Sequence, residues 1–89
     1  MSVYVDRAVH RRRHGKKYYC HMTADSVDEL HAMARRLGVK RHWYHVSRGG
    51  IPHYDLNEVQ RMEAIACGAV PVDRSQWREL KASWREFVA

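Results

Sequence analysis

The sequence has little of several features that identify common protein classes, and cysteine is the first of them. Only two cysteines are present, Cys20 and Cys67, and they do not form a CxxC pair. In a reducing compartment such residues are small buried hydrophobic side chains rather than a disulfide. Zinc held by both cysteines together with histidines is an alternative, but their spacing resembles no zinc-finger pattern.

Long hydrophobic runs and known catalytic motifs are also missing. No apolar run is long enough to cross a bilayer and no signal peptide opens the chain, so we expect a cytoplasmic protein without a membrane partner. The sequence contains no HExxH, no phosphate-binding loop and no nucleophile motif. A length of 89 residues predicts a single domain over 1–89, and a hydrophobic content of 45% argues against wholesale disorder.

Acidic residues are absent from two strongly basic segments. Residues 7–17 and 35–48 contain 11 of the 16 lysines and arginines and no aspartate or glutamate, in a chain whose net charge is +6. This asymmetry indicates a polyanionic partner, such as a nucleic acid or a nucleotide. The alternative is that the basic loop we predict over 7–17 is solvated and only increases solubility.

Hydrophobic periodicity predicts an α/β (α+β) fold, in which three helices pack on a small sheet of three to four short strands. The predicted strands are residues 2–6, 18–22 and 69–72, with a further short strand or short helix around 43–46. The predicted helices are residues 26–38, 56–68 and the C-terminal amphipathic helix 75–88. Ser26 and Glu29 form a capping box for the first helix, Gly38 ends it, and Ser75 caps the third.

The stretch GGIPHYDLNEV, residues 49–59, predicts how the second helix begins. With Asp55 as N-cap, Glu58 completes a capping box, and Tyr54 and Val59 form a hydrophobic staple. These roles leave His53 without a structural task, on a loop at a helix N-terminus where N–H groups favour an anion. The expected buried stripe of this helix is Leu56, Val59, Met62, Ile65 and Ala66.

Residues that helix capping does not explain are candidates for chemistry. His21 lies on a strand face opposite Cys20 and Met22, and it would share a site with His53 if that face is turned toward it. One hypothesis is therefore a metal-dependent or acid–base phosphoester hydrolase. Its candidate catalytic residues are His21, His53, Asp55 and Asp25, with Asp6 at the end of the first strand as a further candidate. The sequence defines no complete metal-ligand set, so a divalent metal is an expectation of this hypothesis alone.

A nucleic-acid or nucleotide-phosphate binding module is the hypothesis that the charge favours. Basic and aromatic residues are interleaved in KKYYCH and KRHWYH, where cations would neutralise phosphates and flat rings would stack on bases. The candidate binding residues are Arg11, Arg12, Arg13, Lys16, Lys17, Lys40, Arg41, Trp43 and Tyr44. The alternative for Trp43 and Tyr44 is that both aromatic side chains pack in the core.

Further interpretations of the function and of single residues stay open at the level of sequence. Residues 29–46 could form a helix-turn-helix with a basic second helix, against which the aromatic and β-branched content of WYHV argues. The helix 75–88 could make the chain a homodimer or a protein-interaction module. His31 is expected to be a packed helix residue, and Glu63 a half-buried carboxylate that either pairs with an arginine or has a functional role.

Several segments in a fixed order resemble a known family. VYVD, HMTAD, ELHAMARRLG, KRHWYH, HYDL and GAVPV follow one another along the chain. This pattern resembles a small family of domains of unknown function from phages and bacteria, over nearly the whole chain up to about Val72. The resemblance implies a single domain with the predicted fold, and it implies no activity. The arginines of HRRRHGKK and the helix 75–88 lie outside the part that is similar.

Overall fold

The computed structural model describes residues 2–6, 20–46 and 51–88, with side chains placed as far as Trp84. The elements are β1 (Val3–Val5), β2 (Cys20–Ala24), α1 (Val27–Leu37), the 3-10 turn η1 (Arg41–Trp43), β3 (Tyr44–Val46), β4 (Pro52–Leu56), α2 (Glu58–Ala66), β5 (Val70–Pro71) and α3 (Arg74–Val88). The basic loop predicted over 7–17 lies outside the described residues. No helix in the described ranges has both the length and the apolar character that a membrane crossing requires.

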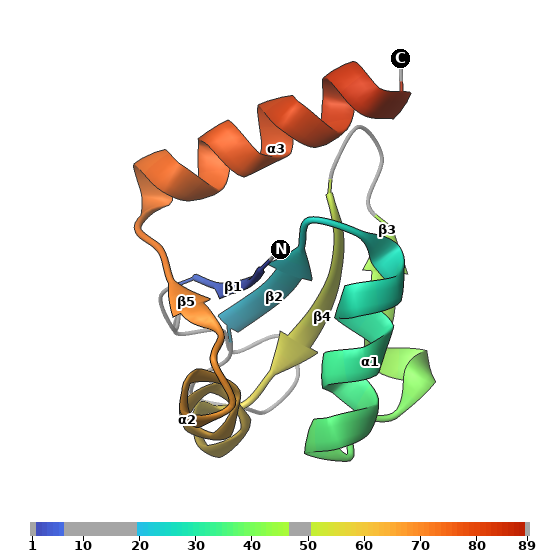
Figure 1. Ribbon diagram of the computed structural model, residues 1–89, viewed down its shortest axis with the longest axis vertical. Coiled ribbons are helices and arrows are strands. Elements are labelled where there is room, and N and C mark those ends of the chain that lie inside the picture. The colour runs from blue at the N-terminus through green and yellow to red at the C-terminus, as the bar shows by residue number, and fades with distance from the viewer. Residues whose placement is uncertain (1, 7–19, 47–50, 89) are drawn as a thin grey trace, which may run out of the picture.

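The strands of the described residues form one mixed sheet in the order β3-β4-β2-β1-β5 (Figure 1). Neighbouring strands are antiparallel except for β1 and β5, which are parallel. The predicted α+β class is confirmed, and the sheet has five strands where we expected three to four. The additional strand is β4, at the centre of the stretch that we had assigned to a loop and a helix start.

The two faces of this sheet differ in chemistry, because successive residues of a strand point to opposite sides. One face carries Val5, Met22, Tyr54 and Leu56, all buried, and α1 and α2 cover it. The other face carries mainly polar side chains, and α3 lies on that side of the strands, away from α1 and α2 (Figure 1). The site described below lies on this polar face.

Helix α1 follows the sequence prediction closely. The Ser26 hydroxyl accepts the backbone N–H of Glu29 at 3.2 Å and donates to the Glu29 carboxylate at 3.0 Å. Gly38 ends the helix in the left-handed conformation, with a φ of 73°, which a residue with a Cβ adopts at a cost. Leu30 and Ala34 are buried against the sheet. The apolar stripe and both caps were therefore sufficient to place this element.

The predicted start of the second helix is wrong. Asp55 is not an N-cap but a residue of β4, and Asn57 caps α2 instead by accepting the Gln60 N–H at 2.8 Å. Gln60 in turn accepts the Asn57 N–H at 2.9 Å, so the capping box exists two residues later than expected. The physical reason is that Tyr54 and Leu56 bury their side chains against α1 and α2 while β4 pairs with strands on both sides. Long-range pairing of that kind overrides a local cap pattern.

The later start also changes which face of α2 is buried. Val59 and Met62 are 62% and 65% exposed, so the staple does not form, and of the predicted stripe only Leu56 and Ile65 pack against the core. The helix packs instead through Ala64, which is fully buried, and Glu63 is exposed rather than half-buried. A similar shift occurs at α3, where Asp73 rather than Ser75 accepts the Gln76 N–H at 2.8 Å.

Residues 39–46 resolve the choice between a strand and a short helix. Residues 41–43 form the 3-10 turn η1, and residues 44–46 form the edge strand β3. A helix-turn-helix requires a full second helix at this position, so that interpretation is wrong. The β-branched and aromatic side chains after Arg41 favour strand pairing with β4 over continued helix.

Replacing the true N-cap of α2 should weaken the fold. We expect Asn57→Ala to lower the free energy of unfolding by about 1 kcal/mol, because the Gln60 N–H then has no side-chain acceptor. Urea unfolding followed by circular dichroism measures this. Asn57→Asp keeps an acceptor oxygen and should retain most of the stability; equal losses in the two variants would show that the cap is not the cause.

Candidate metal centre

Three neighbouring strands place histidine and aspartate side chains on the polar face of the sheet. His21 of β2 pairs directly with Asp55 of β4, and His53 of β4 pairs with His45 of β3. His53 and Asp55 are two residues apart on one strand, so both point to the same side as His21. The antiparallel register alone therefore gathers side chains that are more than 30 residues apart in sequence.

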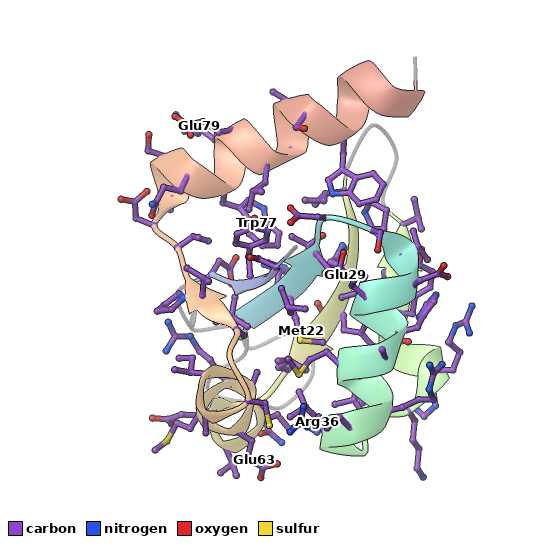
Figure 2. The ribbon with its side chains drawn as sticks, in the orientation of Figure 1. Met22, Glu29, Arg36, Glu63, Trp77 and Glu79 are labelled. Atoms are coloured by element: carbon purple, nitrogen blue, oxygen red, sulfur yellow. The ribbon has the colours of Figure 1, made fainter. Side chains whose placement is uncertain are left out.

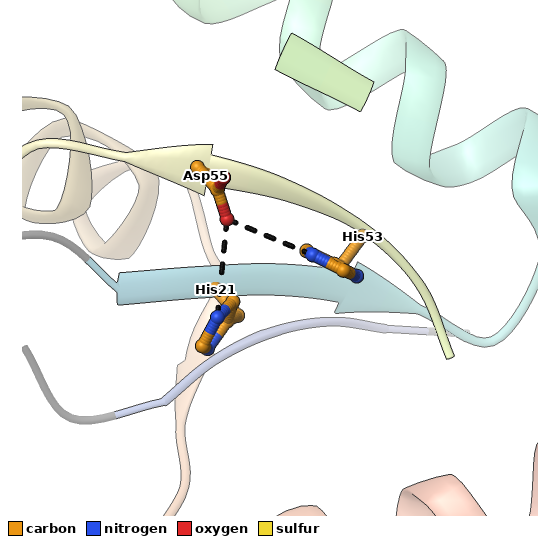
Figure 3. A group of neighbouring side chains, drawn as sticks. All are labelled: His21, His53 and Asp55. Atoms are coloured by element: carbon orange, nitrogen blue, oxygen red, sulfur yellow. Dashed lines mark ion pairs between the residues drawn. The ribbon is translucent and has the colours of Figure 1, made fainter. Parts of the chain in front are cut away.

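His21, His53 and Asp55 converge around the Asp55 carboxylate (Figure 3). The Nε2 atoms of His21 and His53 lie 3.9 Å and 3.6 Å from Asp55 Oδ1. One ligand atom from each of the three residues lies within 4.8 Å of the others. The two imidazole rings meet edge to face, with ring centroids 5.0 Å apart.

The opposite nitrogen of each ring is held by an acceptor. His21 Nδ1 lies 2.7 Å from Asp6 Oδ2, and His53 Nδ1 lies 2.8 Å from the carbonyl oxygen of Ile51. A carbonyl and a carboxylate only accept hydrogen bonds, so each Nδ1 carries the proton. The Nε2 atom of each ring then faces the Asp55 carboxylate, and in the neutral form of the ring its lone pair is available to a metal ion, as in a metal-ligating histidine with an outer hydrogen bond.

Asp6 is fixed in place by both its side chain and its backbone. Its Oδ1 accepts the backbone N–H of His21 at 2.6 Å, and its own N–H donates to the His21 carbonyl at 3.0 Å. Arg61 of α2 donates from Nε to the Asp6 carbonyl oxygen at 2.8 Å. Asp6 therefore orients the His21 ring without belonging to the group of converging atoms.

Burial favours the neutral form of His53. The side chain is 12% exposed, and desolvation lowers the pKa of His53 below its usual value of 6.5. The hydrogen bond to Ile51 and the charge of Asp55 oppose this effect, while the neighbouring His21 and His45 add to it. A neutral imidazole is the form that binds a metal ion.

The arrangement fits a divalent metal ion. Ligands about 2.0–2.2 Å from zinc at tetrahedral angles lie about 3.4 Å from one another. The two histidine–aspartate separations of 3.6 Å and 3.9 Å exceed this value, and all three ligand atoms lie within 4.8 Å of one another, so side-chain rotations would be needed to complete the geometry. Without a cation or a proton between them, the nitrogen lone pairs and the carboxylate oxygen repel each other.

Comparison with known proteins places the chain in a family. Residues 3–83 match the family described as a protein of unknown function, DUF4031. The chain belongs to this family. The match continues into α3, beyond the limit near Val72 that the sequence resemblance suggested, so α3 as far as residue 83 is part of the DUF4031 domain. No curated protein and no solved structure matches the chain.

The remaining catalytic candidate of the DUF4031 domain, Asp25, does not belong to the centre. Asp25 accepts the Ser2 N–H at 2.7 Å and the Tyr4 hydroxyl at 2.9 Å, at the far end of β2. Burial, and then this hydrogen bond, raise the pKa of Tyr4. Asp25 therefore has a structural role in tying the N-terminal residues to the start of α1.

The predicted nucleic-acid residues divide into two groups. Arg11, Arg12, Arg13, Lys16 and Lys17 lie outside the described residues. Lys40 and Arg41 are exposed, whereas Trp43 and Tyr44 are half-buried against the hydrophobic core. The Tyr44 ring contacts His31 and Tyr54. The Arg41 guanidinium lies 5.5 Å from the centroid of the Tyr44 ring. Packing against the hydrophobic core therefore covers much of the surface of Trp43 and Tyr44, as the alternative prediction for these residues expected.

Other sequence candidates have structural surroundings. His31 of α1 is a packed helix residue as expected, and its Nδ1 lies 2.7 Å from the Tyr54 hydroxyl. Cys20 is buried, and desolvation raises the pKa of its thiol to about 12, so it is an inert core residue. Cys67 is also a free thiol, half-buried at the end of α2.

Two residues near the centre were not among the sequence candidates for catalysis. His45 Nε2 lies 3.5 Å from Asp55 Oδ2, whereas His21 and His53 lie near the other oxygen, Oδ1. The His45 side chain is 49% exposed. Trp77 extends from α3 toward the sheet (Figure 2), and its ring lies 5.7 Å from that of His21. The i, i+2 spacing in HYD would have indicated the centre if that segment had been assigned to a strand.

Acid should destabilise the metal-free protein through His53. Its pKa is lowered in the folded state, so the folded chain binds fewer protons than the unfolded chain below pH 6.5. The stability present above that pH is then lost as the pH falls from 6.5 toward the lowered value. Urea unfolding in EDTA at several pH values should show this decline, and His53→Gln should flatten it. An unchanged slope in His53→Gln, or an equal change in the exposed control His42→Gln, would contradict this assignment.

Proposed function

We propose that this domain binds a divalent transition-metal ion through His21, His53 and Asp55 and acts as a metal-dependent hydrolase of phosphoesters. The observation that carries this proposal is the convergence of two imidazole Nε2 atoms on one carboxylate oxygen, with each Nδ1 held by an acceptor. A metal-ligating histidine almost always donates its other ring N–H to a carboxylate, a backbone carbonyl or water, and both rings have such an acceptor here.

The ligand types favour particular ions. Two imidazole nitrogens and one carboxylate oxygen suit Zn²⁺, Fe²⁺ or Co²⁺ better than Mg²⁺ or Ca²⁺, which prefer oxygen ligands. The same combination of ligands occurs in hydrolytic zinc sites and in non-haem iron sites. The hydrolytic interpretation is favoured here because the chain has a strong positive charge that suits an anionic substrate.

Three protein ligands on one face of a sheet leave further coordination positions for water or substrate. Since the ligands all project from β2 and β4, those positions face away from the sheet, on the side where α3 lies. A bound metal ion would supply Lewis-acid polarisation of a phosphoryl oxygen and activation of water. Asp6 would hold the His21 ring in the ligating tautomer, as a positioning residue.

His45 is the group best placed to exchange protons with solvent. Its Nε2 is within 3.5 Å of Asp55 Oδ2, and half of its side chain is exposed. An imidazole can both donate and accept a proton, which suits transfer of a proton to the oxygen that leaves a phosphoester. The Lys40 and Arg41 side chains, exposed on the chain just before β3, would attract the anionic substrate.

Metal titration tests the centre directly. Isothermal titration with Zn²⁺ and the visible spectrum of the Co²⁺ form should show one ion per chain. Because each ligand contributes a bond, we expect His21→Ala, His53→Ala and Asp55→Ala to weaken binding by more than the roughly 10- to 100-fold that loss of an outer partner causes. Asp6→Asn, which removes only the outer partner of His21, should fall within that 10- to 100-fold range.

Matched controls separate this result from general effects on folding. His42→Ala changes an exposed histidine of η1, and Asp25→Asn changes a carboxylate of the far end of β2. Both should bind the metal like the unchanged protein. Hydrolysis of an activated phosphodiester should require the metal and disappear in His53→Ala. Failure to bind Zn²⁺ or Co²⁺ would refute the metal centre, while binding without metal-dependent hydrolysis would refute only the reaction.

A polyanion partner is also part of the proposal, since the charge of the chain supports it. Substitution of Arg11, Arg12 and Arg13 together by alanine should weaken binding of a labelled oligonucleotide and flatten its salt dependence by about one unit of slope for each phosphate that these side chains neutralise. Fluorescence anisotropy at several salt concentrations measures this, and thermal unfolding should be almost unchanged. Arg74→Ala with Arg78→Ala, on the exposed side of α3, is the control. Equally weakened binding in both variants would show a non-specific effect of net charge.

A further inference from the structure

A cavity of about 240 Å³ lies between α3 and the junction of β2 with α1. Its apolar walls come from both sides, Ala24 and Val27 below and Leu80 and Trp84 of α3 above. Polar groups also line it, namely the Asp25 carboxylate and the hydroxyls of Ser26 and Ser83. Ligand pockets commonly combine apolar walls with a few polar groups in this way, and because this cavity is smaller than the roughly 300–1,000 Å³ of most of them, it would hold part of a ligand, such as one ring system.

The cavity and the proposed metal centre both lie under α3. Along β2 and along α3, the residues at the metal centre come first and the residues at the cavity follow. On β2, Ala24 follows His21 by three residues, or about 10 Å of extended chain. On α3, Trp84 follows Trp77 by seven residues, or about 10 Å of helix. Trp77 contacts His21 while Trp84 lines the cavity beside Ala24. A ligand bound at both places would therefore span about 10 Å along α3, which is about the length of one nucleotide.

The chemistry of the two places selects the ligand class. The metal centre would bind an anionic oxygen, as a phosphate offers, and the Trp84 side chain forms part of the cavity wall, against which an aromatic base would pack. Asp25 already accepts two hydrogen bonds, and a carboxylate has room for about four, so it can accept one from an amino group of a base. We propose that this site binds a nucleoside phosphate, with its phosphate at the centre of His21, His53 and Asp55 and its base in the cavity beside Trp84.

This inference rests on the proposed metal centre for the phosphate, while the cavity is an independent observation. Isothermal titration of the Zn²⁺-loaded protein with adenosine 5′-monophosphate, inorganic phosphate and adenosine separates the two contributions. We expect the nucleotide to bind about 5- to 150-fold more tightly than inorganic phosphate, the range that base stacking on an aromatic ring contributes. A 5′-phosphorylated oligonucleotide in the same titration distinguishes the end of a strand from a free nucleotide as the source of this group.

Filling the cavity tests where the base lies. Ser83→Leu places a larger side chain in the cavity wall and should reduce nucleotide affinity to within about twofold of inorganic phosphate, with Zn²⁺ affinity unchanged. Ser75→Leu, the same substitution on an exposed part of α3, should leave both affinities unchanged. Equal affinities for nucleotide and phosphate, or no effect of Ser83→Leu, would overturn the base site while the metal centre stands.

The same titrations decide the question if the metal centre fails. When Zn²⁺ does not bind, adenosine and the nucleotide are titrated against the metal-free protein. Binding that Ser83→Leu removes would retain the base site and reject the metal centre alone. Absence of such binding would overturn the base site as well, and the cavity would then be a packing gap between α3 and the start of α1.

Discussion

The register between β2 and β4 is the constraint on which the rest of this structure depends. It pairs His21 with Asp55 on one face and Met22 with Tyr54 on the other. Because side chains alternate along a strand, a shift of one residue would bury the histidines under α1 and α2 and expose the core. The apolar residues that stabilise the fold therefore also determine where the polar residues converge. Hydrophobic burial at Met22, Tyr54 and Leu56 fixes the candidate centre without any contribution from the centre itself.

The difference between the two helices α1 and α2 shows what the sequence could and could not predict. The caps and the apolar stripe of α1 are local, and they agree with its tertiary packing, so its bounds were predictable. At α2, two capping patterns overlap: Asp55 with Glu58, and Asn57 with Gln60. Local chemistry does not distinguish them strongly. The choice is made by β4, whose pairing with β2 and β3 uses residues distant in sequence.

The candidate centre was predictable in part for the same reason. Removing residues with capping roles left His21 and His53 as candidates, and the structure brings them together. Asp55 belonged to the same set although a cap role had been predicted for it, and that cap role does not exist. Asp25 stayed a catalytic candidate because the sequence does not reveal its hydrogen bonds to Ser2 and Tyr4, which are more than 20 residues away along the chain. The proximity of His45 and Trp77 depends on strand order and helix placement, which periodicity does not specify.

The placement of α3 over a polar sheet face is the least usual aspect of the packing. An amphipathic helix ordinarily buries its apolar stripe against apolar side chains. Here Trp77 meets an imidazole, and Leu80 and Trp84 border a cavity rather than a filled core. The neutral His53 ring beside the partly buried Asp55 carboxylate is also an unfavourable contact when no cation or proton lies between them. Both features are unfavourable for a domain that only has to fold, and binding of the proposed cation and aromatic ligand would relieve both. The convergence of these polar groups beside a cavity under α3 is thus the strongest physical reason to propose a binding site on this face.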